Sequence, residues 1–309
     1  MMKAIRIHDF GTPDVLSLEQ VERPEPATGE VLIKVLAASV NPVDWKIRSG
    51  DYGAVDEDRL PMILGRDICG EAEALGEGVG HIAVGDRMFA FLDMSRGGYA
   101  EYVAVPAEHL AAVPQSLSAE EAAAVPLAGL TAWQGLIDHG GLQEGQRVLV
   151  HGGGGGVGHL AVQIAKAKGA WVATTVSPED MEFARKLGAD QVIDYKSEIF
   201  EDVLDPVDLV FDLIGGETRM RSFEVLKEGG IMVSTLGEPD RETASKFKVR
   251  TAGYMAKPNG GQLAEIAELV ERRKLRISVQ NTFQLSDAAK AQAVLENQHT
   301  QGKVVLSVA

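Results

Sequence analysis

The chain of 309 residues has little cysteine, comparatively few basic residues and no long apolar run. Its one cysteine, Cys69, excludes an internal disulfide and any zinc site with two or more thiolates, and it favours a reducing, cytoplasmic compartment. Against 45 Asp and Glu residues stand only 30 Lys and Arg, a net charge of −15. This charge argues against a nucleic-acid backbone or an anionic membrane surface as the main partner, and a small-molecule ligand fits better.

Segments that signal a membrane span or export are also missing. The weakly polar run 122–137 contains Pro126 and Gly129 and is shorter than the roughly 20 residues that a membrane span needs. The N-terminus enters an alternating pattern at once, with no basic stretch before an apolar one, so we expect no secretory signal.

Glycine is the residue in excess, with 34 positions, about 11% of the chain against a usual ~7%. At roughly 150 residues per domain, the length predicts about two domains. Residues 3–114 form short β-like runs, such as 31–40 and 99–105, separated by Gly, Pro and Asp turns. We expect this part of the chain to be mostly strand.

After Ser118 the pattern changes to helix and then to strands that alternate with helices. Alanine-rich helices are expected at 120–125 and 130–140, and the segment 157–168 has the apolar spacing of an amphipathic helix. Short, continuously apolar strands are predicted at 147–150, 171–176, 191–195, 209–214 and 231–235. Such alternation predicts a doubly wound parallel sheet. Beyond Pro258 we expect helices at 262–274 and 287–297 and strands at 279–285 and 303–308.

A glycine loop follows the first of these strands, where five consecutive glycines, 152–156, precede Val157 and Gly158. Gly153, Gly155 and Gly158 satisfy the G-x-G-x-x-G spacing, which allows a tight turn, admits a pyrophosphate to the backbone and lets helix and strand pack closely. The N-terminus of the following helix favours an anion. A flexible linker is the alternative, but a linker would not lie inside a strand–helix–strand pattern. The loop therefore predicts dinucleotide binding.

The end of the second predicted strand bears on the choice between NADP(H) and NAD(H). An NAD enzyme usually has an acid about 20 residues after the loop, which holds the ribose 2′-hydroxyl. Here the stretch reads Thr174-Thr-Val-Ser177, which contains no acid and favours NADP(H). Glu179 and Asp180 follow, and a carboxylate repels a 2′-phosphate unless it is screened or turned away, so NAD(H) stays open.

Several further segments, considered together in their order and spacing along the chain, resemble those of a known protein family. They are Asn41-Pro-Val-Asp-Trp-Lys46, Gly65-Arg-Asp-Ile-Cys-Gly70, Val84-Gly-Asp-Arg87, Gly98-Tyr-Ala-Glu-Tyr-Val103, Pro126-Leu-Ala-Gly-Leu-Thr-Ala-Trp133, Leu187-Gly-Ala-Asp190, Val192-Ile-Asp-Tyr195 and Gly302-Lys-Val-Val-Leu306. With the glycine loop, they make the chain resemble the medium-chain dehydrogenase/reductase superfamily, in its zinc-free quinone oxidoreductase branch. The resemblance implies an α/β fold with a GroES-like β-rich catalytic domain, residues 1–121 and 259–309, and a Rossmann doubly wound parallel sheet, residues 122–258.

The chain departs from the zinc-dependent relatives at the positions of their metal ligands. Those relatives hold the catalytic zinc with a cysteine near the position of Asn41 and a histidine at that of Arg66, and their four-cysteine lobe has no counterpart after Arg96. We therefore expect no zinc. The resemblance then implies hydride transfer to an acceptor that is already electrophilic, either a quinone or an α,β-unsaturated carbonyl (enone).

The resemblance also names residues for each side of the reaction. Asn41 and Tyr52 are expected to bind the acceptor oxygen, with Tyr52 the better candidate for a proton donor; their alternatives are a turn residue and a loop aromatic. Ser177 and Tyr195 are expected to flank the adenosine ribose and its 2′-phosphate, and Asp180 stands where many NADPH-using relatives have lysine. The expected cofactor-binding residues are Thr131, Gly153, Gly155, Gly156, Val157, Gly158, Ser177, Tyr195 and Gly215.

Other interpretations stay open at this point. The function has two alternatives, an enoyl-thioester reductase of the same superfamily and a protein that binds NADPH without turnover as a sensor or structural protein. Arg66 and Asp67 are expected to make structural hydrogen bonds rather than act as a catalytic pair. Cys69 is expected to be a small buried apolar side chain. The last strand of the sheet, about 248–254, is expected to pair across a two-fold axis in a homodimer, because an unpaired edge needs protection.

Overall fold

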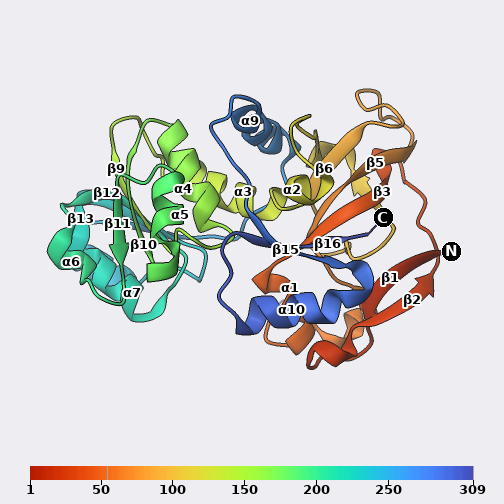
Figure 1. The fold of residues 1–309 in the computed structure, drawn as a ribbon, viewed down its shortest axis with the longest axis horizontal. Helices are drawn as coiled ribbons and strands as arrows, with labels where there is room; N and C mark the ends of the chain where they lie inside the picture. The colour runs from red at the N-terminus through yellow and green to blue at the C-terminus, as the bar shows by residue number, and fades with distance from the viewer. Residues whose placement is uncertain (54, 309) are drawn as a thin grey trace. The chain divides into compact units, whose positions relative to one another are not determined.

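A computed structural model describes residues 1–53 and 55–308, and its contacts divide the chain into two compact units (Figure 1). The first unit comprises Met1–Leu127, Lys257–Glu271 and Ile277–Ala309, and the second comprises Ala128–Ala256 and Arg272–Arg276. The first unit is thus completed by the C-terminal part of the chain. Helix α2 (Ala119–Ala123), which the predicted boundary at residue 121 would cut, packs against strands of the first unit.

The first unit contains two sheets. The smaller one has the strand order β2-β1-β4. The larger has the order β15-β16-β3-β5-β6-β8, with β7 also paired to β3, and only β15 and β16 run parallel to each other. The strands are β1 (Met2–Ile7), β2 (Ser17–Val21), β3 (Glu30–Val40), β4 (Met62–Ile63), β5 (Asp67–Leu75), β6 (Arg87–Phe91), β7 (Tyr102–Pro106), β8 (Leu110–Ala112), β15 (Val279–Gln284) and β16 (Lys303–Ser307).

One helix interrupts this β-rich unit at a place that the alternating pattern does not reveal, whereas two others lie near the helices expected at 262–274 and 287–297. Helix α1 (Pro42–Ser49) begins with a proline at its first position, where no N–H is needed, and ends at Gly50, whose φ of +84° is left-handed. The other helices are α9 (Gly260–Glu271) and α10 (Ala288–Asn297), with 3₁₀ turns η1 (Pro13–Val15), η2 (Glu57–Arg59), η3 (Ala107–His109) and η7 (Leu285–Asp287).

The second unit is built on one sheet of six parallel strands in the order β11-β10-β9-β12-β13-β14. Numbered along the chain, this order is 3-2-1-4-5-6, that of a dinucleotide-binding doubly wound fold. The predicted fold class is therefore confirmed. The strands are β9 (Arg147–His151), β10 (Trp171–Val176), β11 (Gln191–Asp194), β12 (Val207–Asp212), β13 (Leu226–Ser234) and β14 (Arg250–Gly253).

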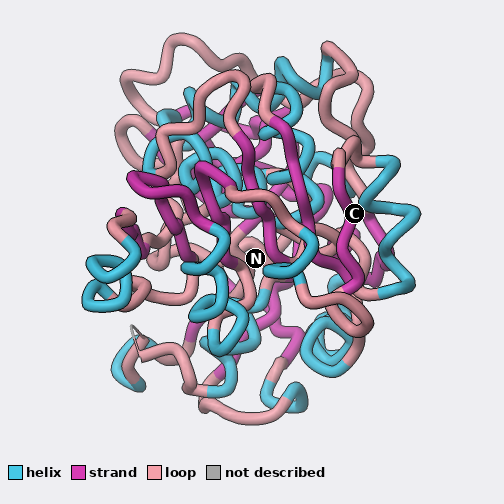
Figure 2. Tube along the Cα trace, turned by 90° about the vertical axis from the view of Figure 1, so that its left-hand side faces the viewer, coloured by secondary structure: helices cyan, strands magenta, loops and turns pink. Residues whose placement is uncertain are grey.

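Helices lie between the successive parallel strands. Figure 2 colours the Cα trace by secondary structure, with helices in cyan and strands in magenta. These helices are α4 (Gly158–Ala167), α5 (Met181–Lys186), α6 (Phe200–Val203), α7 (Gly216–Arg221) and α8 (Arg241–Phe247), with 3₁₀ turns η5 (Pro178–Asp180) and η6 (Ser222–Val225). Before β9 comes α3 (Pro126–Trp133), continued by a π-helical turn η4 (Gln134–His139). Within residues 1–53 and 55–308, no helix is both long and apolar enough to cross a membrane.

Two element boundaries differ from the prediction, one because a polar side chain starts a turn and one because a proline begins a helix. The strand expected at 209–214 ends at Asp212, whose Oδ1 accepts hydrogen bonds from the N–H groups of Ile214 (3.0 Å) and Gly215 (2.8 Å) and so starts a turn. The helix expected from residue 130 begins earlier because Pro126 suits a first helical turn.

Candidate functional site

The glycine loop lies between β9 and α4, as the sequence predicts, and its packing explains two of its glycines. A Cβ on Gly153 would lie 2.0 Å from Oγ1 of Thr174 on the neighbouring strand. On Gly158, the first residue of α4, a Cβ would lie 2.0 Å from the carbonyl oxygen of Gly152. Both distances are far below a van der Waals contact, so only glycine lets the loop and the helix come this close to the sheet.

Gly155 differs because the protein itself leaves space beside it. The nearest atom to a Cβ at this position is the Gly152 carbonyl oxygen, at 3.5 Å, an ordinary contact. Gly156 and Val157 follow in the same loop and lead into α4, where the His159 N–H donates to the Gly155 carbonyl (3.0 Å). The first N–H groups of a helix otherwise lack intrahelical partners. A glycine that internal packing does not require, next to a helix N-terminus, fits a pyrophosphate approaching the backbone.

The predicted adenosine residues lie where β10 and β11 end. Val176 pairs with Asp194, and the Tyr195 N–H donates to the Val176 carbonyl (3.2 Å), so Ser177 and Tyr195 leave the sheet side by side. Ser177 is 4% exposed and its Oγ has no hydrogen-bond partner among the described residues, whereas Tyr195 is 58% exposed. A buried hydroxyl without a partner is unusual and fits a site completed by a polar ligand.

Asp180, at the end of η5, faces the glycine loop. The residue is 3% exposed, and its Oδ2 would lie 2.2 Å from a Cβ on Gly154. The carboxylate therefore fills the space beside Gly154 rather than standing out into solvent. Its neighbour Glu179 is exposed and lies 3.8 Å from the ammonium of Lys196, the residue after Tyr195.

The remaining predicted cofactor residues occupy separate places in the second unit. Thr131 is buried within α3, and its carbonyl oxygen accepts a hydrogen bond from the Tyr254 hydroxyl. Gly215 has a φ of +76° and immediately precedes α7, at the turn after β12 that Asp212 holds. This turn and the glycine loop follow neighbouring parallel strands, β12 and β9, and so lie at the same edge of the sheet.

Sequence reasoning assigned no role to His151, which links the loop to the rest of the second unit. Its Nδ1 lies 2.9 Å from Oγ1 of Thr175 and its Nε2 lies 2.8 Å from Oγ of Ser222. Burial lowers the pKa of His151 to about 4, so the ring is neutral near neutral pH. A histidine at the end of a buried strand was the only signal of this structural role.

In the first unit, the register of strands β3, β5 and β16 brings a group of polar side chains together at the N-terminus of α1. Ser39 on β3 pairs with Asp67 on β5, and Val40 pairs with Val304 on β16, which places Lys303 beside Asn41. Asp67 Oδ2 accepts hydrogen bonds from the Ser39 hydroxyl (2.5 Å) and from Nδ2 of Asn41 (2.8 Å). Lys303 donates to Oδ1 of Asn41 and lies 3.9 Å from Asp67 Oδ2. We call Ser39, Asn41, Asp67 and Lys303 the polar cluster.

The polar cluster is almost closed to solvent: Asn41 is 1% exposed, Asp67 0% and Lys303 3%. Burial raises the pKa of Asp67, while Lys303 and the hydroxyl, amide and backbone N–H groups around the carboxylate oppose that rise. Burial likewise lowers the pKa of Lys303, against the attraction of Asp67. Lysine can only donate, so Lys303 fixes which end of the Asn41 amide faces Asp67.

A second buried carboxylate lies next to the polar cluster. Asp44 Oδ2 accepts hydrogen bonds from the Asn41 N–H (2.8 Å) and the Tyr99 hydroxyl (3.0 Å), and this contact caps α1. Burial raises the pKa of Asp44 to about 7, and the negative charge of Asp67 adds to the rise. Asp44 and Lys303 were not predicted, although an acid at the third helical position after Asn41-Pro42 is a capping signal.

Arg66 and Asp67 are neighbours in sequence but have different partners. Nε of Arg66 donates to the Leu92 carbonyl (2.9 Å), and its guanidinium also contacts the sulfur of Met94. This is the structural hydrogen-bonding role expected from the sequence. Tyr52, half-buried beyond α1, packs against the core of the first unit and lies near Arg66.

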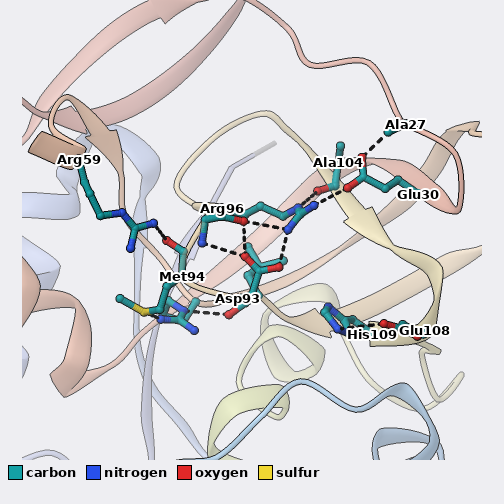
Figure 3. A network of polar contacts seen from close by, with 12 residues as sticks. Ala27, Glu30, Arg59, Asp93, Met94, Arg96, Ala104, Glu108 and His109 are labelled. Carbon is teal, nitrogen blue, oxygen red and sulfur yellow. Dashed lines mark hydrogen bonds and ion pairs between the residues drawn. The ribbon is translucent and has the colours of Figure 1, made fainter. Parts of the chain in front are cut away.

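The loop after β6 is held by arginines, as Figure 3 shows for Asp93, Met94 and Arg96. Arg59 donates to the Met94 carbonyl (2.6 Å), and Arg96 pairs with Asp93 and Glu30. A surface hollow of about 680 Å³ lies along this loop, and neither Asn41 nor Tyr52 lines it. The hollow is therefore distinct from the polar cluster.

Cys69 lies on β5, fully buried, and burial raises the pKa of its thiol to about 12. The expectation of a small buried apolar side chain is confirmed, because a thiol with this pKa is not a nucleophile near neutral pH. Within residues 1–53 and 55–308, no three His, Cys, Asp or Glu side chains gather in a group that could hold a metal ion.

Comparison with known proteins places this geometry among oxidoreductases. Residues 27–115 match the alcohol dehydrogenase GroES-like domain, and residues 187–306 match the zinc-binding dehydrogenase family. The chain is 38% identical over 317 residues to an Arabidopsis thaliana protein named NADPH-dependent alkenal/one oxidoreductase, chloroplastic, covering 99% of this chain and 79% of the relative.

Solved structures are similar over the whole chain. The quinone oxidoreductase from Coxiella burnetii has a TM-score of 0.91 at 39% identity, covering 100% of this chain and 99% of that one. A mycobacterial protein whose structure was solved in complex with NADPH has a TM-score of 0.88 at 32% identity, covering 99% of this chain and 100% of that one.

Proposed function

Because the chain belongs to the medium-chain dehydrogenase/reductase superfamily, in its quinone oxidoreductase branch, we propose that it is an NADPH-dependent reductase of quinones or α,β-unsaturated carbonyls. The observation that carries the proposal is the glycine loop, where Gly153 and Gly158 pack against backbone and strand while Gly155 stays open beside a helix N-terminus. Two relatives named for such acceptors, and one solved with NADPH, support it.

The residues of the second unit fit this cofactor. When bound, NADPH supplies a hydride to the acceptor. Gly155, Gly156 and Val157 would hold the pyrophosphate at the start of α4, and the Ser177 hydroxyl would gain the partner that it lacks among the described residues. Thr131 and Gly215 are proposed to contact the nicotinamide half.

On the acceptor side we propose that Asn41 and Tyr52 orient the quinone or carbonyl oxygen. The Asn41 amide is hydrogen-bonded to Asp67 and Lys303, so it would have to give up one of these hydrogen bonds to bind an acceptor oxygen. Tyr52 is half-buried near Arg66 and is the candidate proton donor. If Tyr52→Phe and Asn41→Ala both keep the turnover number of the parent protein, these roles are wrong.

We also propose that the reaction needs no zinc. At the positions where the zinc-dependent relatives have a cysteine and a histidine, this chain has Asn41, whose amide is held by Asp67 and Lys303, and Arg66, a side chain that carries a positive charge and is not a metal ligand. The check is metal analysis of active protein, with activity measured before and after chelation. Stoichiometric zinc that is lost together with activity would contradict the proposal.

The main experiment is a panel of quinones and enones, assayed with NADPH and with NADH on one preparation. We expect steady oxidation of NADPH with at least one acceptor class. Tight binding of NADPH without turnover of any acceptor would instead favour a sensor or structural protein. Equal kcat/KM for the two cofactors would contradict the NADPH preference.

We propose that the protein is a homodimer that pairs through β14. This strand is at the edge of the six-stranded sheet, and among the described residues no further strand covers its outer side. Met255, shortly after the strand, is 65% exposed, and exposed strand edges associate readily. Light scattering at micromolar protein should give twice the monomer mass; the monomer mass would refute the proposal.

We further propose a cytoplasmic location. The chain has one cysteine, Cys69, buried on β5, and it builds no internal disulfide, which suits a reducing compartment. Cell fractionation with antibody detection would test this, and recovery in an oxidising compartment would contradict it.

A further inference from the structure

The rim formed by the ends of β10 and β11 carries a basic side chain that the glycine-loop motif does not explain. The register between Val176 and Asp194 brings Ser177 and Tyr195 out of the sheet together, and Lys196 follows Tyr195. The Lys196 N–H donates to Oδ1 of Asp194 (2.9 Å), so its backbone is fixed at this turn. Its ammonium reaches toward η5 and lies 3.8 Å from Oε1 of Glu179.

The two acids of η5 have different surroundings. Glu179 is 66% exposed at the side chain and its charge is screened by Lys196, whose side chain is 52% exposed. Asp180 is buried against Gly154 and does not stand on the exposed rim. The charge that a ligand meets on the rim is therefore that of the Glu179–Lys196 pair. An exposed pair of this kind is weak, so a stronger anion displaces the carboxylate readily.

Ser177 supplies the second polar group at this place. Its hydroxyl is buried and without a partner among the described residues, and the residue lies between Val176 and η5, directly beside the chain that bears Lys196. A hydroxyl that can donate and an ammonium that can be freed from Glu179 suit a phosphate, which carries close to two negative charges and accepts several hydrogen bonds.

We infer that Lys196, together with the Ser177 hydroxyl, binds the 2′-phosphate of NADPH and sets the preference for NADPH over NADH. Lysine comes here from the turn after β11 instead of from position 180, which is occupied by a buried aspartate. Glu179 holds Lys196 over the rim until the phosphate replaces it. The inference deepens the proposed function and rests on it for the identity of the cofactor.

The test compares two nucleotides that differ only in the 2′-phosphate, adenosine 2′,5′-bisphosphate and adenosine 5′-monophosphate, by calorimetry on the full chain. Lys196→Ala should raise the Kd of the bisphosphate about tenfold and leave that of the monophosphate unchanged, because it removes one charge-assisted contact. Lys196→Arg should restore most of the affinity. Glu179→Gln should lower the Kd of the bisphosphate several-fold, because the lysine loses its competing partner.

The matched control is Lys246→Ala. Lys246 on α8 pairs with Glu242 and is 67% exposed at the side chain, so the control also removes one lysine charge from the second unit. It should change neither affinity. An equal loss for the bisphosphate in Lys246→Ala and Lys196→Ala would show only a general charge effect and would overturn the inference. So would an unchanged Kd in Lys196→Ala, or no binding of the bisphosphate to the parent protein.

Binding of these nucleotides requires no turnover, so the outcomes separate this inference from the proposed function. If the Kd pattern holds but no quinone or enone is reduced, the proposed reaction fails and the role of Lys196 stands. If acceptors are reduced with NADPH but the Kd values do not respond to Lys196 or Glu179, the inference fails and the reaction stands.

Discussion

The candidate site of the first unit is formed by buried polar side chains, whereas the glycine loop in the second unit is formed by main chain. In the first unit, side chains from three strands and one helix meet, and an ammonium and two carboxylates are buried among them. In the second unit, the glycine loop of the site is built from main chain: Gly153 and Gly158 let the loop lie directly on β10 and on itself. A side-chain site fails when a charge is removed, and a main-chain site fails when a methyl group is added.

The largest effect should follow from breaking the buried charges of the first unit. Lys303→Met keeps most of the apolar stem of the side chain but leaves Asp67 buried without its ammonium, so we expect a loss of about 3–5 kcal/mol in the free energy of unfolding. Urea denaturation measures it. The exposed Lys246→Met should change stability by less than about 0.5 kcal/mol. A similarly small change in Lys303→Met would show that Asp67 is already neutral in the folded protein.

Substitution by alanine should affect Gly158 and Gly155 of the second unit differently, the first in stability and the second in NADPH binding. The Cβ of Gly158→Ala would collide with the Gly152 carbonyl oxygen, so we expect a loss of about 2–3 kcal/mol. Gly155→Ala has room and should fold normally, but its Cβ takes the space offered to a pyrophosphate and should weaken binding of NADPH. Thermal unfolding and nucleotide titration separate the two effects. Equal stability losses would mean that Gly155 is also a packing glycine.

The buried histidine gives the second unit a pH dependence. The pKa of His151 is about 4 in the folded protein and near 6.5 when unfolded, so its contribution is complete above pH 6.5 and falls as the pH drops toward 4. Between about pH 7.5 and about pH 5, this amounts to about 2 kcal/mol.

The variant His151→Gln keeps the hydrogen-bonding partners but does not titrate. The difference in unfolding free energy between it and the parent should therefore change by that amount over the same interval. The raised pKa of Asp44 acts in the opposite direction, favouring the folded state as pH falls through 7, but equally in both proteins. A pH-independent difference would contradict a neutral, buried His151.

The smallest expected effect concerns Asp180. Because its carboxylate lies against Gly154 in the loop, Asp180→Asn should strengthen binding of NADPH and NADH by a similar, few-fold factor, through the pyrophosphate that both share. Changes at Lys196 should affect NADPH alone. A response of only NADPH to Asp180→Asn would place this carboxylate at the 2′-phosphate, and Asp180→Lys would then be the stronger test.

Much of the second unit could be predicted from the sequence, because its signals are local. Apolar runs, the glycine loop and the spacing of α4 give β9, α4 and β10 within one or two residues. Helix α1 in the first unit was missed because alternation dominates its surroundings, although Asn41-Pro42 and Asp44 carry start signals. The end of β12 depends on a side-chain turn at Asp212, which apolar patterning does not register.

The sequence by itself determined the fold class, the succession of strands and helices along the chain around the glycine loop, and the chemistry of a dinucleotide site, because each rests on short-range spacing. Only the tertiary structure decided which polar residues meet. Lys303 and Asn41 are far apart in the chain and become neighbours through antiparallel register, and Asp180 proves to be buried while Lys196 stands on the rim. Register and burial are properties of the packed chain, so no local pattern encodes them.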